Sequence, residues 1–581
     1  MSMLSEPDPT YSPSSLESQA TFTHNQMASN EPTHDQLTVS KDPNHPELRN
    51  RPTRVGIIGG GTAGSTIAIR LAELGIETYL FERKASLIDG PPMCHLHAGG
   101  NLYREIPDSD CVALLEQCID ILRLYPYTID VRPTVFAVPT RDPGTPQELL
   151  PRLEILQQAY QGLVDQDPHN KVLGEPDAYY QLYDEATLRA LAQLESVQVP
   201  ATMDEWMIPV AKRLDLTKVK FPLIVVQEYG WNIFRMAASA TLALSHQPRA
   251  HVFTNTTVTQ VSQLTSKSEQ DLPTNKAASS DDTNSNHILG WQIDYLVNDG
   301  SVDSDTSPAQ SPVSDQVQVD YLINACGFRT GIIDDMVGIE TERMVEFKSS
   351  YVTYWDEIGD TAQQIPEIII YGERGTPNGM AQLTPYPEGF FQIHGMSKDV
   401  TLFKDGLVAS SATSAQPDLP DKYVEYIEHG WDPFALKARS QRAIDYVAEF
   451  IPSFGSAITI GNALYGGQQI PGHDDTLRVA DVSLYDDKRY ARAENVKASS
   501  ALLAADEIVM TLTGLGLLKL TEKEEDNRQQ HQWHYLAAVD EGNIDNVAYS
   551  LAKLRHFPTA MSKVNHSITA AAVADLTATI D

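Results

Sequence analysis

The sequence predicts an α/β protein that combines a parallel, nucleotide-binding region with a second, mainly antiparallel α+β region. Three observations lead to this prediction. A strand, a glycine-rich turn, a helix and a second strand follow one another between residues 54 and 84. Strand-like and helix-like segments then alternate through the middle of the chain. Finally, the chain has 581 residues, whereas a single core stops growing at about 250–300 residues, so we expect two or three lobes.

The segment between residues 54 and 84 reads RVGIIGGGTAGSTIAIRLAELGIETYLFERK and contains the pattern Gly59-x-Gly61-x-x-Gly64. Gly59 allows a tight turn, Gly61 lets a pyrophosphate approach the backbone, and Gly64 lets the helix pack on the strand. The N–H groups and the positive end of the helix dipole stabilise a diphosphate. Glu82 ends the second strand and can accept hydrogen bonds from ribose hydroxyls. Because all these parts occur in one unit, the segment predicts a dinucleotide site and not merely a glycine-rich turn.

Further elements follow from apolar periodicity and from β-branched runs. Apolar residues at helical spacing predict a helix over 108–124, which Asp108 or Ser109 can cap. Strands are expected over 134–138, 251–261, 321–325, 368–371 and 390–394, and helices over 231–245 and 495–512.

Polar stretches and the tail complete the predicted organisation. Residues 1–50 are rich in Ser, Pro, Thr, Asn and His and should be disordered. The polar inserts 266–286 and 299–314 read as long loops on either side of a strand over 287–297. Residues 516–581 are expected to form a helical appendage that packs on the main body, because a single helix pair cannot stabilise itself.

Composition narrows the class of protein. The chain carries 43 Lys and Arg against 78 Asp and Glu, a formal net charge of −35, which argues against a nucleic acid partner. The N-terminus lacks the features of a signal peptide, and the longest apolar stretch, 508–520, is shorter than the ~20 residues of a transmembrane helix. Four cysteines, Cys94, Cys111, Cys118 and Cys326, show no metal-binding spacing. We therefore expect reduced thiols, no metal site and a cytoplasmic protein, with docking on the inner face of a membrane left open.

Several later segments, in the same order along the chain, resemble a known group of flavoproteins. They are His97-Ala98-Gly99-Gly100, the segment from Gln227 to Arg235, the strand from Phe253 to Val258, and the strand from Tyr321 to Gly327. Together with the glycine motif they resemble the FAD-dependent oxidoreductases of the D-amino-acid oxidase and glycerol-3-phosphate dehydrogenase type, in scattered pieces over about 54–512.

The resemblance implies a Rossmann-type FAD-binding domain and a substrate domain, with FAD as the cofactor. It implies that His97, Gly99 and Gly100 lie along the flavin, that the backbone of Val258 contacts the adenine, and that Gly327 ends a strand touching the cofactor. The segment nearest to the family's C-terminal flavin motif is 465–472, with Gly467 and Gln468 as contacts in a glycine-rich turn. Arg83, beside Glu82, completes the candidate cofactor contacts.

The implied division of the chain is discontinuous. The FAD-dependent region spans 51–515. Its FAD-binding domain takes about 54–124, 215–345 and 455–515, and its substrate domain about 125–214 and 346–454.

The catalytic candidates follow from the chemistry that a flavin enzyme requires. The cofactor carries out the redox step, and the protein positions the substrate and stabilises charge. His97 and His394 are candidate bases, and Arg374 is a candidate clamp for a carboxylate or phosphate. Lys497, expected in the first turn of the helix near Asn495, can stabilise negative charge on a reduced flavin.

The predicted function is removal of hydride from a small C–H donor, such as a 2-hydroxy acid, an amino acid or a polyol phosphate, to flavin N5. Two alternatives remain at this point. One is a flavin monooxygenase or NAD(P)H-coupled reductase, although the sequence has no second GxGxxG. The other is an FAD-binding scaffold with a partner-docking C-terminal tail. The electron acceptor can be oxygen, a quinone or another protein.

Overall fold

The computed structural model describes residues 51–90, 104, 106–265, 288–298, 313–358, 365–398, 400–477, 482–529 and 533–564. The disorder expected for residues 1–50 and the loops expected over 266–286 and most of 299–314 lie outside these residues. The strand expected over 287–297 is present as β10 (Ile288–Val297).

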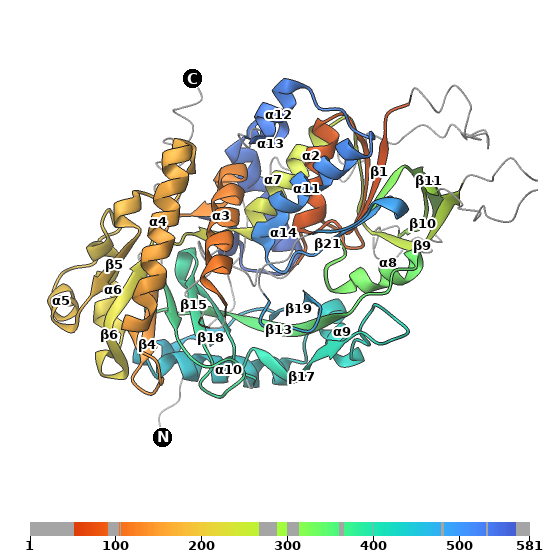
Figure 1. Cartoon of the computed structure of the whole chain (residues 1–581). Coiled ribbons are helices and arrows are strands. Elements are labelled where there is room, and N and C mark those ends of the chain that lie inside the picture. Colours follow the sequence, from red (N-terminus) through yellow and green to blue (C-terminus); the bar gives the residue numbers. More distant parts are fainter. Residues whose placement is uncertain are drawn as a thin grey trace, which may run out of the picture. The chain divides into compact units, whose positions relative to one another are not determined.

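A mostly parallel six-stranded sheet contains the predicted βαβ unit (Figure 1). Its order is β20-β21-β12-β1-β2-β8, in which β20 runs antiparallel to β21 and the other neighbours are parallel. The strands are β20 (Val482–Tyr485), β21 (Tyr490–Ala493), β12 (Tyr321–Asn324), β1 (Arg54–Ile58), β2 (Glu77–Phe81) and β8 (Ala250–Phe253). Because β1 is covered on both faces, its run of apolar residues is continuous, as is usual for a parallel strand.

Helices cover one face of this sheet and an antiparallel meander covers the other. The helices are α2 (Thr62–Glu73), α7 (Ile233–His246) and α11 (Ala501–Gly514), and their apolar residues share one core with Val55 and Ile57. The meander consists of β9 (Thr256–Thr265), β10 and β11 (Val313–Val319). It packs closely on β1, since a Cβ placed on Gly56 would stand 2.4 Å from Cδ1 of Ile293.

A second, larger sheet is mainly antiparallel. Its order is β17-β13-β16-β15-β14-β4-β6-β5, with β18 and β19 also paired to β13, and β14 runs parallel to β4. The strands are β17 (Leu402–Ala409), β13 (Arg343–Tyr354), β16 (Phe390–Gly395), β15 (Ala381–Pro385), β14 (Glu367–Ile370), β4 (Thr134–Pro139), β6 (Val219–Val226), β5 (Tyr180–Tyr183), β18 (Ile458–Thr459) and β19 (Leu464–Pro471). The predicted fold class is therefore confirmed.

The remaining helices pack around the two sheets. They are α3 (Asp108–Leu124), α4 (Leu150–Gln166), α5 (Glu185–Leu191), α6 (Met203–Arg213), α8 (Thr330–Val337), α9 (Asp421–His429), α10 (Pro433–Ala448), α12 (Glu522–Gln529), α13 (His534–Ala537) and α14 (Glu541–Leu554). Strands β3 (Ile129–Asp130) and β7 (Gly230–Trp231) form a short separate pair. No helix among the described residues is long and apolar enough to cross a membrane.

The boundaries of the larger sheet differ from the predicted domain division. Strands β6 and β19 lie in that sheet, although the sequence placed both in the FAD-binding domain. The division into cofactor and substrate domains remains a prediction.

Local differences from the predicted elements have identifiable causes. The expected strand over 251–261 is two strands, β8 and β9, because the chain turns at Asn255, whose φ is 51°. The expected helix over 495–512 begins only at Ala501, after a short 3₁₀ turn, so Lys497 precedes the helix. The helix over 108–124 is present, but Pro107 occupies its N-cap position and no side chain caps it.

Residues 533–564 pack on the helical face of the parallel sheet. Trp533, Ile544 and Met561 are buried in the same core as α2 and α7. The fully buried Arg235 of α7 pairs with Glu541 and Asp545 of α14. Residues 533–564 are thus helical and packed on the body, whereas the appendage over 516–581 as a whole stays a prediction.

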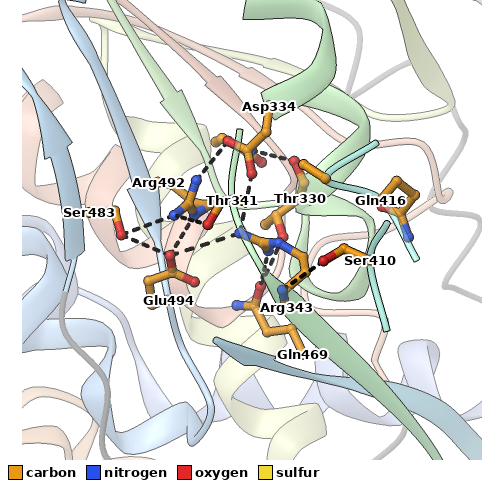
Figure 2. Close-up of polar contacts among 12 residues, drawn as sticks. Thr330, Asp334, Thr341, Arg343, Ser410, Gln416, Gln469, Ser483, Arg492 and Glu494 are labelled. Atoms are coloured by element: carbon orange, nitrogen blue, oxygen red, sulfur yellow. Dashed lines mark hydrogen bonds and ion pairs between the residues drawn. The ribbon is translucent and has the colours of Figure 1, made fainter. Parts of the chain in front are cut away.

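Two arginines and two carboxylates form a buried network between the two sheets (Figure 2). Asp334 of α8 binds both Arg343, at the start of β13, and Arg492 of β21, with O···N distances of 3.2 and 2.9 Å. Glu494 lies 2.5 Å from Nε of Arg492 and 3.9 Å from Nη2 of Arg343. The two positive and two negative charges balance, as buried charges must.

Neutral groups extend this network. Tyr490 donates to Asp334 at 2.6 Å, and Asn324 donates to the hydroxyl oxygen of Tyr490 at 2.8 Å. Burial raises the pKa of Asp334, although the two arginines oppose that change. The cluster therefore ties β12, β21, α8 and β13 together through groups that cannot be separated without leaving a buried charge unpaired.

Replacing Asp334 tests this arrangement. In Asp334→Asn, Arg343 and Arg492 keep only Glu494 as an anionic partner in the cluster. We expect a loss of about 3–5 kcal/mol in the free energy of unfolding, measured by urea denaturation. The exposed pair of Glu185 and Arg189 provides the control, because Glu185→Gln should change stability by less than about 0.5 kcal/mol. Equal effects of the two variants would contradict this interpretation.

Another buried carboxyl group, that of Glu73, lies where the tail meets α2. Glu73 accepts a hydrogen bond from the amide of Tyr535 at 2.6 Å and lies 3.8 Å from Arg70, and its side chain is 7% exposed. Burial raises the pKa of Glu73 from 4.5 to about 7, although the Tyr535 amide and Arg70 oppose that shift.

The raised pKa of Glu73 predicts that the free energy of unfolding falls as the pH rises. The folded protein holds the Glu73 proton more tightly than the unfolded chain, so its contribution is fully present below pH 4.5 and is lost as the pH rises toward 7. The change amounts to about 3 kcal/mol. We expect urea denaturation between pH 5 and pH 8 to show a fall in stability that is smaller in Glu73→Gln. The exposed residue Glu154 serves as the control, and an identical pH slope in Glu73→Gln and the wild type would refute the assignment.

Candidate functional site

The three motif glycines form a tight turn at the carboxyl ends of β1, β2 and β12. Gly59 has a φ of +103° and donates its amide hydrogen to the carbonyl of Phe81 at 2.8 Å. A Cβ on Gly64 would lie 1.9 Å from the carbonyl oxygen of Gly59. Only glycine fits at Gly64, so the start of α2 lies directly against the turn.

The surroundings of Gly61 fit a bound diphosphate. Gly61 is the N-cap of α2, no side chain caps this helix end, and the first turn carries no acidic residue. A Cβ on Gly61 would meet no atom within 4 Å. The N-terminal amides of a helix lack partners within the helix and attract anions. Open space beside these amides is the arrangement that a dinucleotide diphosphate requires.

Glu82 is held in place at the end of β2. Its carboxylate accepts hydrogen bonds from the amides of Gly60 and Lys84, both at 2.7 Å. Burial raises the pKa of Glu82, although these two amides oppose that change. Each carboxylate oxygen has two lone pairs, so Glu82 retains the capacity to accept hydrogen bonds from ribose hydroxyls.

Two further predicted contacts lie near this edge of the sheet. The amide of Thr256 donates to the carbonyl of Glu82 at 2.9 Å, which places the start of β9, and hence Val258, close to the end of β2. Gly327 follows β12, has a φ of +58°, and would have open space around a Cβ. The structure thus brings Gly59, Gly61, Gly64, Glu82 and Gly327 to one edge.

Arg83 lies beside this edge but points to another helix. Its guanidinium is 2.7 Å from Glu428 of α9, which also pairs with Arg329 at 3.2 Å and with Lys84 at 3.8 Å. A role of Arg83 in cofactor binding stays a prediction. The segment with Cys94, His97, Gly99 and Gly100 lies outside the described residues.

One face of the larger sheet carries a layer of buried polar side chains, which we call the polar face. Register places its members across from one another on neighbouring strands. They are Glu346, Lys348 and Ser350 of β13, Gln392 and His394 of β16, Gln382 and Thr384 of β15, and Glu367 of β14, all less than 9% exposed. The opposite face packs apolar residues against α6 and α10.

The polar face is directed toward the segment that leads into α11. Lys348 lies 3.0 Å from Glu346 and donates a hydrogen bond of 2.5 Å to Gln468. Gln468 in turn donates to the carbonyl of Val496 at 3.3 Å. Burial favours a higher pKa for Glu346, but Lys348 and Arg374 outweigh it and lower the pKa.

A second group of contacts runs along β16, β15 and β14. Gln392 donates to Ser350 at 2.9 Å and accepts from Tyr386 at 3.1 Å. Glu367 accepts hydrogen bonds from Gln382 and, at 3.0 Å, from the buried Arg132.

Glu228 lies next to this second group and was not among the predicted site residues. It is 2% exposed, and its backbone carbonyl accepts a hydrogen bond from Thr134 at 3.0 Å. Burial, and after it the charge of Glu367, raises the pKa of Glu228 well above its usual value, while Lys497 acts in the opposite direction. Burial favours the protonated form of a carboxyl, and in that form Glu228 can donate a hydrogen bond as well as accept one.

The predicted catalytic residues occupy different settings. His394 is buried on the polar face, opposite Gln382. Arg374 is bound by two carboxylates of its own chain, Glu346 and Asp475. An anionic substrate would have to displace one of these two carboxylates from Arg374. The role of Arg374 as a clamp for the substrate therefore stays a prediction.

The expected glycine-rich turn over 465–472 is wrong, because this segment is strand β19, paired along its length with β13. Gly467 allows close packing, since a Cβ there would stand 2.9 Å from Cγ of Phe328, the residue after Gly327. Tyr465 packs among aromatic rings that include Phe347 and Trp431. Alternation along a strand sends Tyr465 to this aromatic cluster and Gln468 to the polar face.

The polar face has a signal in the sequence of β13. The segment RMVEFKSSYVTY of β13 alternates Glu346, Lys348 and Ser350 with buried residues of the other face. Period-two alternation of this kind normally marks a strand with one solvated face, and only the tertiary structure shows that both faces are covered.

Comparisons with known proteins give a partial match in sequence. No family model matches the chain. A segment of 52 residues is 44% identical to the chloroplastic geranylgeranyl diphosphate reductase of Nicotiana tabacum, which covers 9% of this chain and 11% of that protein. The chain thus matches only a small part of the length of this relative.

Several solved structures are similar to this chain in backbone fold. Glycine oxidase from Geobacillus kaustophilus has a TM-score of 0.46 and 12% identity, covering 81% of this chain and 96% of that one. L-proline dehydrogenase from P. horikoshii has a TM-score of 0.47 and 12% identity, covering 82% and 96%. Glycerol-3-phosphate dehydrogenase from Bacillus halodurans, complexed with FAD, has a TM-score of 0.46 and 10% identity, covering 89% and 82%.

Two glycines of the motif, Gly61 and Gly64, should differ sharply in the side chains that they tolerate. We expect Gly64→Ala to lower the free energy of unfolding by on the order of 3 kcal/mol, because its Cβ would collide with the backbone of Gly59. Gly61→Ala should cost about 1 kcal/mol or less, since its Cβ enters open space. Urea denaturation of both variants measures the contrast, and similar losses would show that the turn is not packed as described.

Proposed function

We propose that this protein is an FAD-dependent oxidoreductase that takes hydride from a small polar C–H donor. The observation that carries this proposal is the open, uncapped N-terminus of α2 at Gly61, facing the same edge as Glu82 and Gly327. Bound there, FAD would supply the site that accepts the hydride. The amides that begin α2 would hold its diphosphate, and Glu82 would hold its ribose.

The polar face of the larger sheet supports the proposal that the donor binds between that sheet and the segment leading into α11. Lys348, Gln392 and His394 offer hydrogen bonds and charge from three positions on two neighbouring strands. Fixed polar groups in a buried setting orient a substrate and stabilise developing charge without reorganising. This favours a donor with its own hydrogen-bonding groups, such as an amino acid, a 2-hydroxy acid or a polyol phosphate.

Proton handling falls to groups on or beside the polar face. His394 is a candidate base that would remove a proton from a hydroxyl or ammonium group, and Glu228, whose pKa is raised by burial, is a candidate proton donor. Oxygen, a quinone and a protein remain the predicted electron acceptors. Localisation in the cytoplasm, or at the inner face of a membrane, remains a prediction.

One experiment tests the proposal with the purified full-length chain. We expect a yellow protein whose flavin absorption disappears without oxygen on addition of one of the three donor classes. Gly61→Val should fold but lose the flavin, because its side chain would fill the space beside the α2 amides. Gly162→Ala, on the surface of α4 with open space around its Cβ, is the control and should stay yellow.

His394→Ala and Lys348→Met in the same assay should keep the flavin and slow its reduction tenfold or more. A colourless wild-type protein that does not take up FAD would refute the proposal, as would a Gly61→Val variant with full flavin content.

A further inference from the structure

A single arginine of the tail contacts the loop that follows the dinucleotide-binding strand β2. Arg555 immediately follows α14, and its side chain is 7% exposed. Its guanidinium donates to the carbonyl of Leu87 at 2.8 Å, to the carbonyl of Ile88 at 3.0 Å and to the hydroxyl of Ser86 at 3.0 Å. Its Nε also lies 3.1 Å from Asp89. One planar group thus fixes four consecutive residues.

The residue at the centre of these contacts has an unfavourable backbone conformation. Ile88 has a φ of 51° and is buried. A β-branched residue in the left-handed region is strained and persists only where its surroundings hold it. Arg555 binds the Ile88 carbonyl on one side, and on the other side the Ile88 amide donates to the carbonyl of Gly60 at 2.8 Å.

Gly60 connects this strained residue to the dinucleotide turn. It lies between Gly59 and Gly61, and its own amide donates to Glu82. A Cβ on Gly60 would stand 2.7 Å from Cδ2 of Leu87, so the loop also packs directly against the turn. From Arg555 to the glycine motif there is therefore a path of two hydrogen bonds through Ile88.

Electrostatics place Arg555 near the ribose-binding carboxylate as well. Burial lowers the pKa of Arg555, while the charges of Asp89 and Glu82 raise it. The guanidinium is therefore within electrostatic reach of Glu82, although it makes its hydrogen bonds to the neighbouring loop.

We propose that Arg555, which follows α14 in the tail, is a positioning residue of the dinucleotide site. By holding residues 86–89 against Gly60, Arg555 fixes the turn that would receive the diphosphate. The identity of the ligand as FAD rests on the proposed function. The ordering of the turn by Arg555 does not.

The tail offers a matched control, because it is anchored to the body at a second place. Asp545 of α14 pairs with the buried Arg235 of α7, ten residues before Arg555 in the chain. Asp545→Asn weakens the docking of the tail and keeps the contacts of Arg555 to the loop. Deleting the tail would be uninformative, since Trp533 and Met561 belong to the main core.

Two measurements on full-length variants test the proposal. Equilibrium dialysis against FAD should give a Kd at least tenfold weaker for Arg555→Gln, a smaller loss for Arg555→Lys, and a change within twofold for Asp545→Asn. Hydrogen exchange without added FAD should be at least tenfold faster over residues 84–90 and 59–62 in Arg555→Gln, whereas Asp545→Asn should accelerate exchange in α14. Urea midpoints of all variants separate these effects from general stability.

The outcomes are distinct. Wild-type FAD affinity in Arg555→Gln would overturn the proposal, as would an equal loss of affinity in Asp545→Asn. If the wild type binds no FAD, the proposed function fails, and hydrogen exchange alone then decides whether Arg555 orders the turn. Unchanged exchange over residues 59–62 in Arg555→Gln would overturn the inference in that case.

Discussion

The buried network of Asp334, Arg343, Arg492 and Glu494 is the constraint on which the arrangement of the two sheets depends. Arg492 belongs to the parallel sheet, Arg343 begins the longest strand of the larger sheet, and Asp334 on α8 binds both. Buried charges tolerate little displacement, because a separated pair leaves an ion without solvation. The position of β13, and with it the polar face that β13 carries, is therefore fixed relative to the strand ends at which the glycine turn lies.

The dinucleotide edge is assembled from segments that are distant in the sequence. Gly59 packs on the backbone of Ala325, the amide of Thr256 bonds to Glu82, and Ile88 joins the turn to Arg555 of the tail. Each contact is a backbone or guanidinium hydrogen bond or a close approach that a side chain would block. Such contacts pre-organise a binding site, since the cost of ordering the loop is met during folding and not on binding.

The polar face differs from the dinucleotide edge, because its side chains are charged or polar and bind one another. Its charges are already matched within the chain, as Lys348 is with Glu346 and Arg132 is with Glu367. A substrate that enters this region must exchange with these internal partners, so its own charge pattern decides which of them it displaces. Fixed groups with satisfied hydrogen bonds favour specificity over breadth, because a poorly matched donor leaves a buried group unsatisfied.

The sequence by itself determined the βαβ unit, with its tight turn at Gly59 and its close packing at Gly64, and a minority of the other elements, such as α3, α7, β4 and β12. These follow from local rules, namely which residues permit a tight turn and which apolar spacing fits one face of an element. Only the tertiary structure decided that 465–472 is a strand in a second sheet, that both faces of β13 are buried, and that Arg555 reaches the glycine turn. Those facts depend on the pairing of segments more than a hundred residues apart, and the energy of such contacts has no counterpart in local sequence patterns.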